Sequence, residues 1–254
     1  YLNRILGNTI QGADEGGISM CGEAHPDWVD LVHGNTISHN RVSNCGGTSV
    51  RVNNSRDTVI SHNEITETRG RTPLQVGGWS NVEVAIDGGY RIEYNHIHHV
   101  QDEADDSGAI TTTGLTRDSI IRFNLIHDVR AGFFNDNVAV WFDNMSSGWT
   151  IVDNIYFNLE QSEMKLCASV LEDNVYRDNW LIESPASVPE GILEGHPEFD
   201  TDELRIESAD GGVPQRVVTG QILKASATVR NAGETGVSRV DLYVDGKIAE
   251  SRKF

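Results

Sequence analysis

Apolar and polar residues alternate around an asparagine that recurs through the first 180 or so residues of the chain. Each of these asparagines has an aliphatic residue three positions before it and an aliphatic or aromatic residue two positions after it. The seven triplets are Ile5-Asn8-Ile10, Ile37-Asn40-Val42, Ile60-Asn63-Ile65, Ile92-Asn95-Ile97, Ile121-Asn124-Ile126, Ile151-Asn154-Tyr156 and Leu171-Asn174-Tyr176. A period of two residues is typical of β-strands and not of helices. The pattern therefore predicts a repeated unit of two short strands that meet at an asparagine.

The asparagine is expected to form the bend between the two strands. Asn tolerates the left-handed backbone conformation that a turn of one or two residues requires. Successive asparagines are 20 to 32 residues apart. Stacked units would place their side chains about 4.8 Å apart, where the amides can hydrogen-bond in a ladder. We therefore predict that these residues build the fold and take no part in chemistry.

A third strand is predicted between successive asparagine units. The corresponding segments are 18–21, 50–53, 74–77, 110–113 and 140–143, with a weaker copy at 164–167. Repeats of this size with three short parallel strands each predict an all-β fold, the right-handed parallel β-helix with an Asn ladder. No helical period interrupts the pattern in residues 1–182.

The last part of the chain has a different pattern. Residues 221–233 and 239–247 alternate in the manner of antiparallel strands, with Asn-Ala-Gly and Asp-Gly turns. They resemble part of the immunoglobulin-like adhesion modules of bacterial secreted enzymes. We therefore expect a β-helix at 1–200 that lacks its N-terminal coils, a linker at 201–212 and an immunoglobulin-like β-sandwich fragment at 213–254, within a longer, monomeric, multidomain protein.

The composition limits the classes of partner. The chain has 38 acidic and 20 basic residues, a net charge of -18. Five acids and seven bases in residues 209–254 leave -20 on residues 1–208. Nucleic-acid binding requires clustered Lys and Arg, which this chain lacks. No apolar run approaches the ~20 residues of a membrane span, and three cysteines are too few for a disulfide scaffold.

Four segments of the predicted β-helix are similar to a known group of proteins. They are 106–110 (Asp-Ser-Gly-Ala-Ile), 122–129, 147–151 and 195–199 (Gly-His-Pro-Glu-Phe). They resemble the carbohydrate-active right-handed parallel β-helix proteins, which include pectate-lyase-like enzymes and, as the nearest likeness, β-helical glycoside hydrolases. The resemblance implies a polysaccharide or oligosaccharide partner and a secreted or cell-surface location. The chain departs from the group at 111–113, three threonines where aromatic residues are frequent, and at Asn144, where a second Asp is common.

Long inserts precede the third strand, at 11–17, 67–73, 101–108 and 130–137. Because coils stack, these inserts are expected to wall a groove over the outer face of that strand. The outward positions predicted to bind substrate are Arg51, Gln75, Thr111, Trp141 and Lys165. Sugars need hydrogen-bonding side chains and a flat apolar surface, so Trp141 is expected to be an exposed platform.

Acidic residues concentrate in two of these inserts. Asp106 and Asp143 are predicted on adjacent coils, with carboxyl groups roughly 5 to 9 Å apart, a range that covers both glycosidase geometries. The resemblance places the catalytic acid pair on these two residues. We expect Asp106 to be the general acid and Asp143 the base or nucleophile, with Asp136 binding substrate. Hydrolysis of this kind needs no cofactor.

Calcium binding is the alternative for the same acids. Asp102, Asp105 and Asp106 supply hard oxygen ligands of the kind that Ca²⁺ prefers. His98 and His127, each three residues after a ladder asparagine, could orient the acid pair, bind hydroxyl groups or form a structural ladder with Asp128. His39 and His62 are expected to stack on another face as structural residues. No zinc site is expected, because no three ligands follow the usual spacings.

Two other functions are compatible with the sequence. In a polysaccharide lyase, Arg51 or Lys165 would abstract a proton next to a uronic acid carboxylate that Ca²⁺ neutralises. The net charge of -20 on the predicted β-helix disfavours such an anionic substrate. A surface protein that binds glycans without cleaving them would not depend on the acid pair.

Overall fold

The structure is a computed structural model that describes residues 2–22, 32–78, 87–101, 103, 105–167 and 173–183, and the backbone of 201–208, 223–229, 239–244 and 247–253. The chain divides into two compact units. The first comprises residues 1–188 with 195–197, and the second comprises 189–194 with 198–254. No helix long and apolar enough to cross a membrane is found in the described part of the chain.

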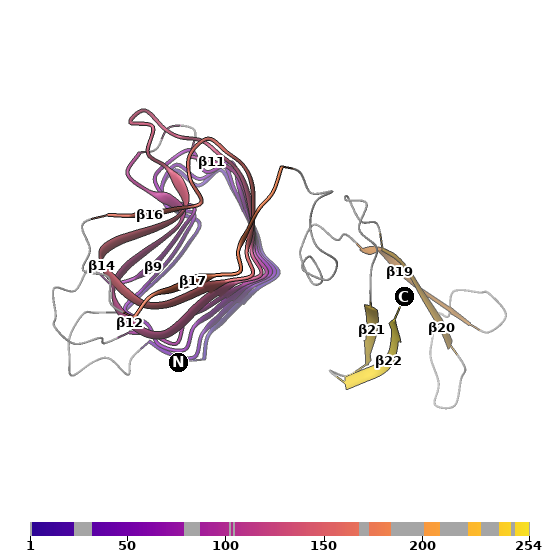
Figure 1. The fold of residues 1–254 in the computed structure, drawn as a ribbon. Helices are drawn as coiled ribbons and strands as arrows, with labels where there is room; N and C mark the ends of the chain where they lie inside the picture. Colours follow the sequence, from indigo (N-terminus) through magenta and orange to yellow (C-terminus); the bar gives the residue numbers. More distant parts are fainter. Residues whose placement is uncertain are drawn as a thin grey trace. The chain divides into compact units, whose positions relative to one another are not determined.

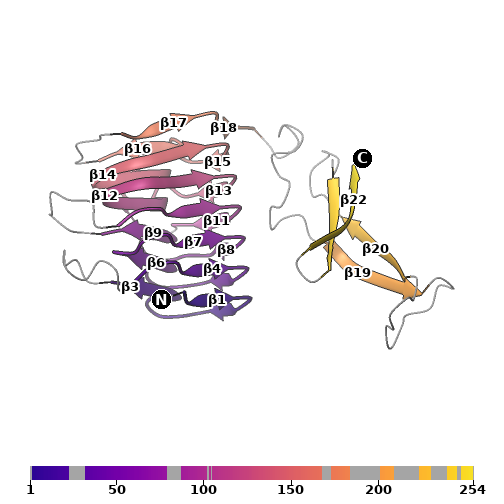
Figure 2. The same cartoon turned by 90° about the horizontal axis from the view of Figure 1, so that it is seen from below.

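The first unit is a stack of coils with three faces, each built of parallel strands (Figures 1 and 2). The first face contains β1 (Arg4–Leu6), β4 (Thr36–Ser38), β7 (Val59–Ser61), β10 (Arg91–Glu93) and β17 (Val175–Arg177). The second face contains β2 (Thr9–Gln11), β5 (Arg41–Ser43), β8 (Glu64–Thr66), β11 (His96–Val100), β13 (Leu125–Val129), β15 (Ile155–Leu159) and β18 (Trp180–Leu181). The third face contains β3 (Ile18–Cys21), β6 (Val50–Asn53), β9 (Leu74–Gly77) and β16 (Met164–Leu166).

Two long strands connect the third face to the first. These are β12 (Gly108–Arg122) and β14 (Val138–Val152), which pair with each other in parallel. Through them the first and third faces form one 11-stranded sheet, while the second face is a separate seven-stranded sheet. Each of the six segments predicted as a third strand contains or overlaps an observed strand. The prediction of an all-β fold with parallel strands is confirmed.

The interior of the coils is filled by aliphatic residues in register. Ile37, Ile60, Ile92 and Ile121 are fully buried and lie side by side on neighbouring strands. Because successive residues of a strand point to opposite faces, the intervening polar residues are directed outward. This alternation is the period of two that is visible in the sequence.

The predicted asparagine ladder is present, but its last residue differs from the prediction. Each Nδ2 donates to the Oδ1 of the next asparagine at 2.9 to 3.0 Å, in the order Asn8, Asn40, Asn63, Asn95, Asn124, Asn154, Asn179. The prediction that Asn174 ends the ladder is wrong. The pairing of β14 with β17 aligns Ile151 with Tyr176, which puts Asn179 next to Asn154. Asn174 instead accepts a hydrogen bond from the backbone N–H of Trp149 at 3.0 Å.

The sharp bend belongs to the residue before each ladder asparagine. His39, His62, Tyr94 and Phe123 have φ values of 54 to 56°, in the left-handed region that the sequence analysis had assigned to Asn. Their side chains also stack on one another, with ring centroids 4.9 to 5.0 Å apart. The expected stacking of His39 on His62 is therefore confirmed. We infer that the ladder hydrogen bonds hold the neighbouring residue in this costly conformation.

The second unit contains two antiparallel pairs. β19 (Thr201–Ser208) pairs with β20 (Leu223–Val229), and β21 (Arg239–Val244) pairs with β22 (Lys247–Lys253). The strand β19 lies within the segment expected to be a linker. The immunoglobulin-like assignment stays a prediction.

Candidate active site

The two acidic inserts meet where β12 and β14 begin. Asp106 lies two residues before β12, and Asp136 lies two residues before β14. The backbone N–H of Asp106 donates to Oδ1 of Asp136 at 3.2 Å. The backbone N–H of Phe134 donates to Oδ1 of Asp105 at 2.7 Å. These two hydrogen bonds connect the inserts, so the acids of both coils are held on the same side of the sheet.

Asp143 is a partly buried carboxyl group with a raised pKa. It lies on β14, in register with Thr113 of β12. Burial raises its pKa above the ordinary value, and the negative charge of Asp106 raises it further, while a hydrogen bond from the backbone N–H of Asn144 and the charge of Arg71 lower it. The contribution of Asp106 to this shift means that its charge lies within interaction range of the Asp143 carboxyl group. The assignment of the two residues as an acid pair stays a prediction.

Lys165 lies over the same region from the next coil. The register places Thr111, Trp141 and Lys165 side by side on three coils. The Lys165 Nζ lies 3.2 Å from Oδ2 of Asp136 and 4.1 Å from the centroid of the Trp141 ring. One ammonium group therefore contacts both a candidate substrate-binding acid and the indole ring.

The prediction that Trp141 is an exposed platform is wrong. Its side chain is fully buried, and Lys165 covers the face of its ring. Gly108 packs against the base of the same side chain, where an added Cβ atom would lie only 2.8 Å from the Trp141 Cβ. The indole ring therefore packs beneath the Lys165 side chain and is not exposed for contact with a sugar ring.

Two other outward positions that were predicted to bind substrate are also buried. Gln75 and Thr111 are 8% and 5% exposed. The Thr111 hydroxyl accepts a hydrogen bond from the N–H of Gly108 at 3.0 Å. Arg51 is exposed and donates to Oγ1 of Thr48 at 3.2 Å. Of the five predicted positions, Arg51 is thus exposed and Lys165 is partly exposed.

Two exposed aromatic side chains were missed by the sequence analysis. Phe133 and Phe134 are 88% and 70% exposed, and their rings pack edge to face with centroids 5.3 Å apart. They lie in the insert that also carries Asp136. The sequence signal that could have identified them is the pair of consecutive aromatic residues in an otherwise polar insert. An insert outside the coils has no core in which such side chains could be buried.

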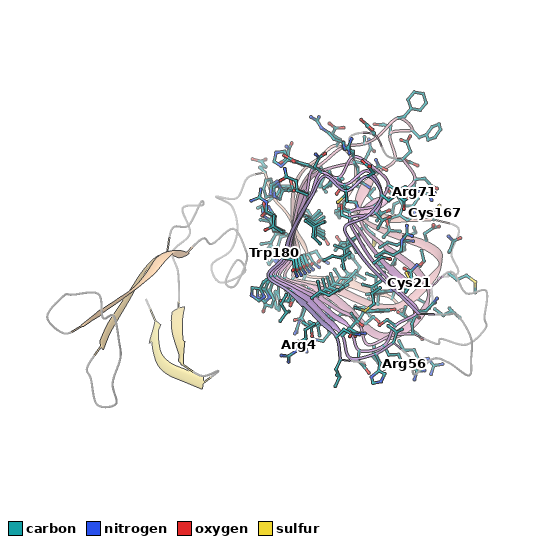
Figure 3. All side chains as sticks on the ribbon, turned by 180° about the vertical axis from the view of Figure 1, so that it is seen from behind. Arg4, Cys21, Arg56, Arg71, Cys167 and Trp180 are labelled. Atoms are coloured by element: carbon teal, nitrogen blue, oxygen red, sulfur yellow. The ribbon has the colours of Figure 1, made fainter. Side chains whose placement is uncertain are left out.

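Arg71 and Cys167 lie on the same side of the coils (Figure 3). Burial raises the pKa of the Cys167 thiol, and the charges of Asp143, Asp106 and Asp136 raise it further. A thiol with a raised pKa stays protonated and is a poor nucleophile.

The calcium alternative stays a prediction. Asp102 lies outside the described residues, and Asp105 is engaged with the backbone of Phe134. Among the described residues, the acids of the inserts do not form a group of three converging ligands.

The histidines expected near the acid pair belong to another sheet. His98 and His127 stack with ring centroids 5.1 Å apart on β11 and β13, in the seven-stranded sheet. Their carboxylate neighbours are Glu64, 3.4 Å from Nε2 of His98, and Asp128, 2.6 Å from Nδ1 of His127. Stacking as a ladder, with Asp128 as a partner, is thus the arrangement that forms.

Comparisons with known proteins bear on the fold. No protein-family model and no curated protein matches the chain. A solved structure named "Glycoside hydrolase" is similar, with a TM-score of 0.61 and 22% identical residues over 76% of this chain. The alignment covers 34% of that protein, so the chain spans about a third of its length. The likeness supports the parallel β-fold.

Proposed function

We propose that the chain is part of a glycoside hydrolase that cleaves a polysaccharide over β12 and β14, with Asp106 and Asp143 as the acid pair. The observation that carries the proposal is the raised pKa of Asp143, to which the charge of Asp106 contributes. Hydrolysis requires two carboxyl groups in different protonation states, and neighbouring like charges produce that difference. The glycoside hydrolase name of the similar structure supports the same class.

The environments of the two acids favour a particular division of roles. A general acid must stay protonated until it donates to the glycosidic oxygen, so it needs a raised pKa. Asp143 is partly buried and has this property, whereas Asp106 is exposed. We therefore assign the general acid to Asp143 and the base or nucleophile to Asp106, the reverse of the order expected from the sequence.

The surroundings supply contacts for hydroxyl groups and sugar rings. Asp136 and Lys165 form an ion pair that is 24% and 35% exposed, with free donor and acceptor capacity for hydroxyls. Phe133 and Phe134 offer the exposed apolar surface that Trp141 does not. These contacts suit a protein that binds polysaccharide.

We propose that the β-helix is right-handed, because crossovers between parallel strands are nearly always right-handed. We also propose that the chain belongs to a secreted or cell-surface multidomain protein.

A lyase mechanism is less well supported. A lyase base must reach a proton of the substrate, but Nζ of Lys165 is held 3.2 Å from Oδ2 of Asp136 and lies over the Trp141 ring. Arg51 is a guanidinium, which stays protonated in proteins. A uronic acid polymer would also meet the net negative charge of residues 1–208.

One assay separates hydrolase, lyase and binding protein. The 254-residue chain is incubated with neutral and acidic polysaccharides, and reducing ends, unsaturated products and retained binding are measured. New reducing ends without unsaturated products are expected. Unsaturated ends would establish a lyase, and binding without either product would establish a non-catalytic glycan-binding protein.

Removal of the Asp106 charge is expected to lower the pKa of Asp143. Burial would still raise that pKa, but the like-charge contribution would be absent in Asp106→Asn. The pKa is measured from the carboxyl ¹³C shift of Asp143 as the pH is varied. In the wild-type protein the midpoint should lie above that of an ordinary aspartate. An unchanged midpoint in the variant would show that the two acids are not coupled.

Truncation of Phe133 and Phe134 together to alanine is expected to weaken substrate binding. Loss of an aromatic surface costs about 1–2 kcal/mol, a rise in KM of roughly 5- to 30-fold. Because both side chains are exposed, the melting temperature should hardly change. KM, kcat and thermal unfolding are compared with those of Leu181→Ala, an exposed residue of β18. A KM equal to that of the control would remove these rings from the proposed site.

A further inference from the structure

Three histidines converge on the outer side of the seven-stranded sheet. Ile97 of β11 and Ile126 of β13 are fully buried in the core. Alternation along the strands therefore directs His96, His98 and His127 to the opposite side. Each offers one ring nitrogen, and these three atoms all lie within 4.8 Å of one another. The sequence conceals the group, because its members come from neighbouring coils.

The nitrogen atoms are close to the spacing of a metal site. Nε2 of His96 lies 2.7 Å from Nε2 of His127. Zinc–imidazole bonds of about 2.0–2.1 Å in tetrahedral geometry place two nitrogens roughly 3.3 Å apart. The other separations within the group do not exceed 4.8 Å. The three rings are stacked, with centroids 3.9 to 5.1 Å apart, so they would turn about their side-chain bonds to direct their nitrogens at one ion. His96 and His127 are only 6% exposed, which shields the group from bulk water.

Carboxylates lie behind two of the rings, as metal-binding histidines usually require. Oδ2 of Asp128 lies 2.6 Å from Nδ1 of His127, so the opposite nitrogen of that ring, Nε2, is the one that faces Nε2 of His96 at hydrogen-bonding distance. Oδ1 of Asp128 in turn accepts a hydrogen bond from Asn158, so the carboxylate is itself held in place. Oε1 of Glu64 lies 3.4 Å from His98. Such second contacts orient the ring and increase its basicity toward the metal.

We propose that His96, His98 and His127 bind one divalent transition metal ion of the zinc class, a site separate from the acid pair. Imidazole ligands favour Zn²⁺, Co²⁺, Ni²⁺ or Cu²⁺ over Ca²⁺ and Mg²⁺, which take oxygen ligands. Three protein nitrogens leave a fourth position for water. Because the ligands come from β11 and β13, the ion would join two neighbouring coils. Asp143 belongs to β14 and Asp106 precedes β12, both strands of the 11-stranded sheet, so the histidine group and the acid pair are associated with different sheets.

Metal titration of the 254-residue chain tests the site. The protein is stripped with EDTA, dialysed and titrated with Zn²⁺ in competition with a chromogenic chelator, and with Co²⁺ by visible absorption. One Zn²⁺ per chain and the intense absorption of tetrahedral cobalt are expected. His127→Gln should weaken Zn²⁺ binding by ~100-fold or more, and Asp128→Asn by ~10- to 100-fold through the lost support of His127.

The matched control is the other histidine stack. His39 and His62 each precede a ladder asparagine, and their ring centroids lie 4.9 Å apart. The next ring in this stack is that of Tyr94, which is not a metal ligand of the histidine type. His39→Gln should therefore leave Zn²⁺ affinity and stoichiometry unchanged. Absence of Zn²⁺ binding by the wild-type chain, or equal binding by the His127 and His39 variants, would overturn the proposal. If His127→Gln does not fold by circular dichroism, the cobalt spectrum of the wild-type protein decides.

Discussion

Asp143→Asn and Asp106→Asn are each expected to lower kcat by at least ~10³-fold on any polysaccharide that the wild-type protein cleaves. The amide of Asn cannot donate an acidic proton to the leaving oxygen, nor can it act as a base or nucleophile. Each substitution nearly preserves side-chain volume, so the coils should stay folded. Initial rates measured from reducing ends, with thermal unfolding in parallel, check this expectation.

The control for these variants is an acid of similar geometry outside the site. Asp153 has a φ of 55°, a conformation that Asn adopts readily, and it precedes a ladder asparagine. Asp153→Asn should therefore retain wild-type kcat and stability. Wild-type turnover by either Asp106→Asn or Asp143→Asn would remove that residue from the mechanism.

Asn95→Ala is expected to destabilise the first unit by at least ~3 kcal/mol. Asn95 is fully buried. Its Oδ1 accepts from the backbone N–H and Nδ2 of Asn63, and its Nδ2 donates to Asn124 and to the carbonyl of Ile60. Alanine would leave these buried groups without partners, at about 1–3 kcal/mol each. The free energy of unfolding in urea measures the loss.

Asn8→Ala is the matched control for the ladder. Asn8 is the first described member of the ladder, is exposed, and donates to Asn40. Its neighbours can hydrogen-bond to water after the substitution, so a loss of about 1 kcal/mol or less is expected. Equal losses at Asn8 and Asn95 would contradict the role assigned to burial in the ladder.

The strands and the ladder could be predicted because they repeat. The period of two shows which residues of each coil point inward and which point outward, and the recurring asparagine shows where each coil bends. The prediction of the last ladder residue was wrong because Tyr176-Asn179-Leu181 fits the sequence pattern about as well as Leu171-Asn174-Tyr176. Only the pairing of β14 with β17 distinguishes the two registers.

The site was less predictable, because it depends on contacts that the repeat does not encode. Trp141 occupies an outward position, yet Lys165 of the next coil covers it. Phe133 and Phe134 lie in an insert, where periodicity carries no information. His96 joins His127 only through the stacking of coils. The division of roles between Asp106 and Asp143 likewise depends on burial, which a sequence pattern gives only roughly.

The most direct test of the proposed hydrolysis is cleavage in ¹⁸O-labelled water. Hydrolysis adds one solvent oxygen to the new reducing end of each cleaved bond, whereas a lyase adds none. Mass spectrometry of the oligosaccharide products should show one ¹⁸O per new reducing end for the wild-type chain, and no labelled product above background for Asp143→Asn. Products without the label, or equal labelling by the wild-type protein and the variant, would contradict hydrolysis by this acid pair.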